Sequence, residues 1–152
     1  MRHAARALAL LTIAVALCSC GSYTRADFIA GADAICASAV RQTRTLEPPQ
    51  SEQMSALAAY LARVLPIVRH ETRQLRALRR PSQPAQAARR LGRYLAAVAE
   101  VGRDYAALAA AAARGSAPAV ASAEAELRAI PLASLAAGYG LRSCGTPGAT
   151  VS

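Results

Sequence analysis

Residues 85–114 read AQAARRLGRYLAAVAEVGRDYAALAAAAAR, a stretch without proline. Apolar side chains recur in it at intervals of three or four residues, the spacing that gives a helix one apolar face. Ala and Leu favour helix, and the β-branched and aromatic residues that strands prefer are few in the whole chain. The stretch therefore predicts a long helix from about Ala85 to Arg114. Its inward face is expected to carry Leu91, Leu95, Val98, Tyr105 and Leu108.

Towards the N-terminus, a segment with the same spacing begins at a helix-start signal. Thr24 is followed three residues later by Asp27, the arrangement of a capping box, in which each side chain accepts a hydrogen bond from the other residue's backbone N–H. The spacing continues to Leu46. Pro48 and Pro49 end it, because the residue before a proline is driven out of the helical region. We therefore predict a first helix between Thr24 and the proline pair.

Two further segments are predicted to be helices that contain a proline. The second helix is expected to be capped by Ser51 and to keep one apolar face over residues 54–78. Pro66 removes a hydrogen bond within it and should kink it about one turn earlier. The fourth helix covers about 118–138, and Pro131 either kinks it or splits it in two.

Short turns join these segments, and short turns make consecutive helices antiparallel neighbours. We therefore expect an all-α fold, an up-down-up-down four-helix bundle with kinked helices, over residues 25–145. Residues 146–152 are expected to form a flexible tail. The many alanines bury little apolar area per residue, so a covalent cross-link would matter to stability.

The N-terminal residues have the pattern of an export signal. Arg2 and Arg6 precede an apolar run over 7–17. This run is shorter than the roughly 20 residues of a membrane-spanning helix, which favours a cleaved signal peptide over a membrane span. No other stretch of the sequence qualifies as a span.

The end of this run identifies the kind of signal. Leu17-Cys18-Ser19-Cys20 resembles the lipobox of bacterial lipoproteins, with an apolar residue at position −3, a small residue at −1 and the cysteine that receives lipid. The resemblance implies a signal peptide over 1–19, lipidation of Cys20, a short tether over 20–24, and a location at the extracytoplasmic face of the cell membrane. The alternative is an ordinary signal peptide whose cysteines are incidental.

If Cys20 carries lipid, Cys36 and Cys144 are the cysteines that remain. An exported protein meets an oxidising environment, and one pair has one possible connectivity, so we expect a Cys36–Cys144 disulfide. The chain-entropy argument gives roughly 4 to 5 kcal/mol for a loop of about 100 residues. A metal site or a catalytic thiol is the alternative. His70 is the single histidine after the signal and there is no CxxC spacing, so neither is favoured, and we expect no metal and no cofactor.

The two ends of the exported part carry a second resemblance. Asp27-Phe28-Ile29 leads into Ala32-Asp33-Ala34-Ile35-Cys36, and the chain closes with Gly140-Leu141-Arg142-Ser143-Cys144-Gly145. With the proline-punctuated helices, these segments resemble small secreted helical lipoproteins of actinobacteria, a group of uncharacterised function. The resemblance implies a helical secreted domain closed by a disulfide, and it implies no activity.

Positive charge is concentrated in one part of the chain. After the signal's Arg2 and Arg6 are set aside, 16 Arg face 9 acidic residues, a net charge of +7. Nine of these arginines and Glu71 alone among the acidic residues lie in segment 63–93, which is therefore +8. In an up-down bundle, the junction of the second and third helices lies at the end where the first helix leaves the anchor.

We therefore expect this junction to rest on anionic lipid headgroups, as a second, electrostatic membrane contact. The alternative is a solvated face in a chain whose 18 basic residues are all arginine. Nucleic acid is not favoured as a partner, because the signal directs export and aromatic residues are not interleaved with the arginines. The arginines of the expected contact are Arg76, Arg79, Arg80, Arg89, Arg90 and Arg93.

No set of residues in the sequence supports an enzyme. His70 lies among arginines and lacks an orienting carboxylate, because Glu71 beside it points elsewhere on a helix. Two functions remain: a membrane-anchored envelope lipoprotein that binds an envelope protein or the membrane surface, or a carrier of a small apolar ligand between the kinked helices. The carrier would use a pocket lined by Tyr60, Tyr94 and Tyr105.

Overall fold

The computed structural model describes residues 22–145. The predicted signal peptide, Cys20 and the predicted tail over 146–152 lie outside this range. The described residues form five helices and no strand. The helices are α1 (Arg25–Arg44), α2 (Met54–Ala77), α3 (Ala85–Ala113), α4 (Ala117–Ala129) and α5 (Leu132–Tyr139).

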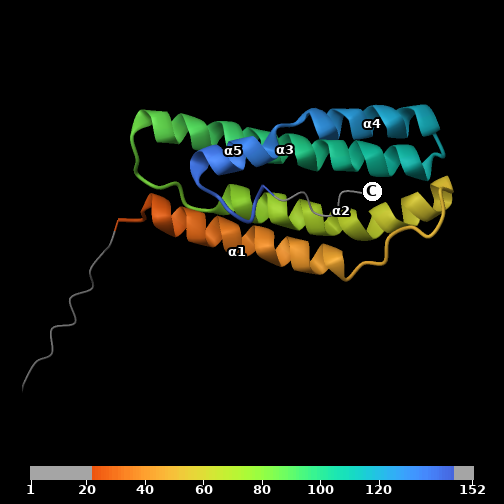
Figure 1. Ribbon diagram of the computed structural model, residues 1–152, viewed down its shortest axis with the longest axis horizontal. Helices are drawn as coiled ribbons and strands as arrows, with labels where there is room; N and C mark the ends of the chain where they lie inside the picture. The colour runs from red at the N-terminus through yellow and green to blue at the C-terminus, as the bar shows by residue number, and fades with distance from the viewer. Residues whose placement is uncertain (1–21, 146–152) are drawn as a thin grey trace, which may run out of the picture.

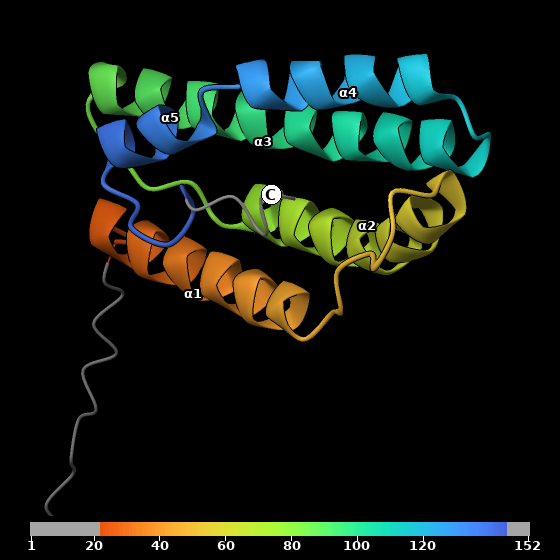
Figure 2. The same ribbon diagram turned by 45° about the vertical axis from the view of Figure 1, so that its right-hand side comes forward.

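The helices are arranged as a four-helix bundle in which α4 and α5 together form the fourth arm (Figures 1 and 2). α1 packs on α2, α2 packs on α3, and both α4 and α5 pack on α3. Consecutive arms run in opposite directions, as the short turns require. The predicted all-α bundle closed by one disulfide is confirmed.

The predicted capping box at the start of α1 is present. Asp27 N–H donates to the Thr24 hydroxyl oxygen at 3.2 Å, and Thr24 N–H donates to the Asp27 carboxylate at 2.8 Å. The hydrogen bonds from Thr24 lower the pKa of Asp27. The capping box therefore sets the point at which the bundle begins.

The predicted cap of the second helix was wrong. α2 begins at Met54, and its N-cap is Gln53, which makes no side-chain capping bond. A helix capped at Ser51 would place Met54 three residues later, and a thioether cannot complete a capping box. Gln53 instead accepts backbone hydrogen bonds from Ala56 and Leu57 through its carbonyl oxygen.

The two prolines inside helical segments have different outcomes. α2 continues through Pro66, and Figure 1 shows it bent about halfway along its length. Pro131 splits the fourth arm, because α4 ends at Ala129 and α5 starts at Leu132. A short extended stretch at Ile130 separates the two helices.

Buried side chains form two cores along the bundle axis. We call the end where α1 begins, α2 meets α3 and α5 finishes the proximal end (Figure 1), and the other the distal end. The proximal core contains Phe28, Leu75, Tyr94 and Tyr139, and the distal core is built around Tyr60, Leu61, Val64, Leu108 and Val120. The proximal end is therefore held by its own packed interior.

The Cys36–Cys144 disulfide is formed, with an S–S distance of 2.07 Å and a Cα–Cα distance of 5.0 Å. Asp33 on α1 holds the turn of the chain just before Cys144. One carboxylate oxygen of Asp33 accepts hydrogen bonds from the backbone N–H groups of Arg142 and Ser143, at 2.9 and 2.8 Å. Asp33 and the disulfide together fix the C-terminal segment to α1.

Candidate functional site

The six arginines of the expected anionic contact all have exposed side chains. They lie at the end of α2, in the α2–α3 junction and in the first turns of α3. Figure 1 places this junction at the proximal end, where α1 begins. The structure therefore brings together the arginines and the start of the folded chain. We call Arg76, Arg79, Arg80, Arg89, Arg90 and Arg93 the arginine platform.

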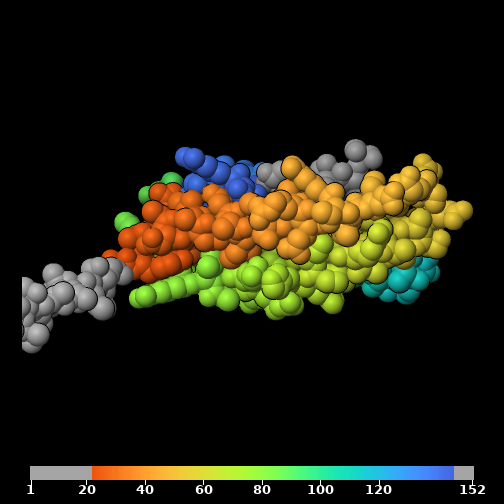
Figure 3. All heavy atoms as spheres, turned by 90° about the horizontal axis from the view of Figure 1, so that it is seen from below, coloured from red at the N-terminus to blue at the C-terminus, as the bar shows by residue number. Residues whose placement is uncertain are grey.

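Tyr23 links the platform directly to the N-terminal segment. Its ring packs against the proximal core, and the guanidinium carbon of Arg79 lies 5.9 Å from the ring centroid. Cation–π contacts at this distance are attractive. In the space-filling view, atoms of the α2–α3 junction project beside the start of α1 (Figure 3). Tyr23 is the second residue that the structure describes, so the platform lies beside the start of the described chain.

A second set of contacts ties the other proximal elements together around Tyr139. Its hydroxyl donates to the Gln83 side-chain oxygen at 2.8 Å, which connects α5 to the α2–α3 junction. Arg25 of α1 donates to the Tyr139 carbonyl oxygen and stacks over its ring at 5.0 Å. Phe28 meets the same ring edge-on at 5.8 Å. These contacts join α1, α5 and the α2–α3 junction at the proximal end.

No carboxylate neutralises the platform within residues 22–145. The ion pair found in that range is Arg128–Glu124 on α4, at 3.6 Å. Glu71, the acidic residue of segment 63–93, is half-buried on α2, and burial raises its pKa to about 7. Glu71 forms no ion pair with a platform arginine within the described residues, so the platform keeps its positive charge.

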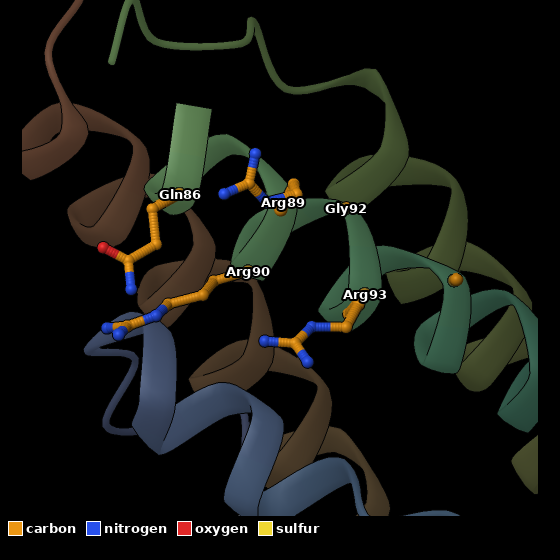
Figure 4. A pocket seen from close by; sticks show the side chains of 6 residues that line it. Gln86, Arg89, Arg90, Gly92 and Arg93 are labelled. Carbon is orange, nitrogen blue, oxygen red and sulfur yellow. The ribbon is translucent and has the colours of Figure 1, made fainter. Parts of the chain in front are cut away.

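Two open grooves share Arg90 and Arg93. The larger, of about 630 Å³, is also lined by Gln86, Arg89, Gly92 and Ala96 of α3. In Figure 4, Gln86 and Arg90 extend towards α5. An Arg90 guanidinium nitrogen lies 3.5 Å from the Gly138 carbonyl oxygen. The smaller groove, of about 290 Å³, adds Ser134, Leu135 and Gly138 of the fourth arm.

The other candidate residues do not form a reactive site in the described part of the chain. His70 is exposed on α2. Cys36 and Cys144 are joined in the disulfide, so neither is a free thiol. Within residues 22–145 no group of three or more His, Cys, Asp or Glu side chains is placed to hold a metal ion.

The tyrosines considered for an apolar pocket are packing residues. Tyr94 is buried in the proximal core and Tyr60 in the distal core, and Tyr105 packs against the distal core. Burial raises the pKa of Tyr94, with Glu71 and Asp33 adding to the shift. None of the three lines either groove.

Sequence reasoning missed two features of this region. In the sequence Asp33 stands out only as part of the segment that leads into Cys36, whereas its carboxylate accepts hydrogen bonds from backbone groups more than a hundred residues away. Gly92 and Gly138 were not singled out as groove residues. The sequence did contain a signal for Gly92. A glycine inside a long alanine-rich helix lowers the stability of that helix, which indicates that space is needed at this position.

The described helices include none that is long and apolar enough to cross a membrane. No protein-family model, curated protein or solved structure matches the chain.

Proposed function

We propose that the protein is a non-enzymatic envelope lipoprotein, held by lipid on Cys20 at the extracytoplasmic face of the cell membrane. Its arginine platform rests on anionic lipid headgroups beside the anchor. The observation that supports the proposal is the position of the platform: six exposed arginines without carboxylate partners lie at the end of the bundle where α1 begins.

The energetics favour such a contact. A basic residue near an anionic membrane surface contributes about 1 kcal/mol, and the attraction fades over about one Debye length, roughly 8 to 10 Å. The lipid keeps the platform within that distance. The platform then orients the molecule, with the proximal end on the membrane and the distal end presented to an envelope protein.

The distal end has a different charge pattern, which supports this orientation. Its loop and helix ends carry both signs, with Arg44, Glu47, Glu52 and Arg114 exposed. A mixed surface gains little from an anionic membrane, because attraction and repulsion offset each other. The proximal end is therefore the end that an anionic surface attracts.

Hydrogen–deuterium exchange of the lipidated protein in nanodiscs tests the proposal. In discs that contain anionic phosphatidylglycerol, backbone amides of residues 78–93 should exchange more slowly than in discs of neutral phosphatidylcholine. The difference should shrink as salt rises, because salt screens the attraction. Equal exchange in the two discs would contradict the platform's role.

A matched pair of variants sharpens this test. Replacing Arg79, Arg80, Arg89 and Arg90 with Gln should abolish the difference between the two discs. Replacing four exposed arginines outside the platform, Arg41, Arg44, Arg103 and Arg114, removes the same charge and should leave it in place. If both variants lose the difference alike, net charge and not the platform is responsible.

The packing of the tyrosines gives the ligand-carrier alternative no support. Tyr60 and Tyr94 fill the two cores instead of lining a cavity. The two grooves lie open at the surface, and both are lined by the exposed Arg90 and Arg93. A surface function therefore has the stronger support.

A further inference from the structure

The glycines of the bundle point to a ligand site. A Cβ atom added to Gly31 would meet Leu78 at 3.5 Å, and one added to Gly102 would meet the Thr72 hydroxyl at 3.2 Å, so neighbouring helices account for these two. Gly92 and Gly138 are also helical, yet a Cβ atom at either would meet nothing within 4 Å. At Gly92, in the interior of α3, glycine is less favourable than alanine. Gly92 and Gly138 each line one of the grooves beside Arg90 and Arg93.

The arginines of the groove repel one another along α3. Arg89 and Arg93 are four residues apart, Arg90 and Arg93 are three apart, and like charges at these spacings destabilise a helix. No acidic residue stands three or four positions from any of them, and Gln86 occupies the position where a glutamate would pair with Arg90. On α4, by contrast, Glu124 and Arg128 stand four residues apart and form an ion pair. The groove is thus lined by arginines that have no acidic partner within the described residues.

We propose that this groove binds the phosphate of a single anionic phospholipid, an inference that rests on the proposed function and names its ligand. Arg90 and Arg93 hold the phosphate oxygens, because guanidinium groups match phosphate geometry with paired hydrogen bonds. The Gln86 amide donates a further hydrogen bond. The glycerol lies over Gly92, where the absence of a side chain leaves room, and the acyl chains run back along α3 towards the proximal end and the bilayer.

The position of the groove fits a lipid in the membrane surface. Arg93 lies about 12 Å along α3 from Ala85, given a rise of 1.5 Å per residue. A lipid held there draws the α3 and α5 side of the proximal end towards the headgroups. A diffuse electrostatic contact would need only the charges, whereas this site also needs the space at Gly92.

Native mass spectrometry of the lipidated protein in a neutral detergent tests the site. Dioleoyl phosphatidic acid is added, and the lipids retained on the protein are counted. We expect one retained molecule at low lipid concentration, and at least tenfold weaker retention of dioleoyl phosphatidylcholine. Inorganic phosphate should displace the lipid only at much higher concentration; displacement at equal concentration would mean that free phosphate is the ligand and would overturn the lipid assignment.

Two pairs of variants separate a built groove from general attraction. Gly92→Gln fills the groove without changing charge and should weaken retention at least fivefold, whereas Ala107→Gln, on an exposed part of the same helix, should not. Arg90→Gln with Arg93→Gln should weaken it at least tenfold. Arg103→Gln with Arg114→Gln removes the same charge outside the groove and should change it less than twofold.

Equal retention by Gly92→Gln and the unmodified protein would overturn the site, provided that circular dichroism shows the variant folded. That result leaves the nanodisc difference untouched, so the proposed function would survive it. Conversely, equal exchange in anionic and neutral nanodiscs would contradict the membrane contact, even if single lipids are retained in detergent.

Discussion

At the residue scale, Glu71 makes stability depend on pH. The carboxyl group is half-buried on α2, and burial raises its pKa from 4.5 to about 7. Between these two values the folded state holds a proton that the unfolded state has released. The free energy of unfolding therefore falls as pH rises from about 4.5 to about 7 and stays low above that range.

Glu71→Gln should remove this dependence. We expect the variant to be more stable than the unmodified protein above pH 7, by up to about 3 kcal/mol for a shift of this size. Urea unfolding at pH 5 and pH 8 measures the effect. Glu100→Gln, at an exposed position of α3, is the control and should change neither value. A larger loss of stability with rising pH in Glu71→Gln would contradict the assignment.

At the same scale, Asp33 stabilises the closing turn. One of its carboxylate oxygens accepts hydrogen bonds from two backbone N–H groups there. Asp33→Ala leaves these groups without their partner and should lower the free energy of unfolding by about 1 to 3 kcal/mol. Glu124→Ala breaks only an exposed ion pair and should cost about 0.5 kcal/mol or less. Chemical denaturation of both variants gives the comparison, and equal losses would refute the role of Asp33.

At the element scale, the two kinds of helical glycine in α3 should respond differently to alanine. Gly92→Ala should raise the free energy of unfolding by about 0.5 to 1 kcal/mol, because the new methyl group meets no neighbour. Gly102→Ala should gain less or lose stability, since Thr72 lies 3.2 Å from the added atom. Urea titrations decide this. A larger gain at Gly102 than at Gly92 would contradict the packing described for α3.

The elements also show which features a sequence can predict. The start of α1 was predictable because the capping box is local, and Thr24 and Asp27 are three residues apart. Pro131 left two outcomes open, and packing of both α4 and α5 on α3 decided for a split. The role of Asp33 was not predictable, because its partners are 109 and 110 residues away. The smaller groove was missed for the same reason, since it forms only where α5 packs beside α3.

At the scale of the whole molecule, the disulfide joins the first helix to the last turn across 108 residues of sequence. Replacing Cys36 and Cys144 together with Ser should lower the free energy of unfolding by up to about 4 to 5 kcal/mol, because the unfolded chain gains freedom. Thermal unfolding of the variant and of the reduced protein should agree. An unchanged melting temperature in both would show that the alanine-rich bundle is stable without the cross-link.

The bundle topology explains why the arginines and the predicted anchor belong together. α1 leads away from the proximal end, α2 returns to it, and α3 starts there, so residues 23 and 79 meet although they are far apart in sequence. This arrangement was predictable from the order of the helices. The arginines act as a membrane contact only if Cys20 carries lipid.

Intact mass spectrometry of the protein extracted from membranes of its native host tests that claim most directly. The account predicts a chain that starts at Cys20 and carries diacyl or triacyl lipid, and that gains two hydrogens when the disulfide is reduced. A chain without lipid would contradict the account, because nothing would then hold the arginine platform beside a membrane.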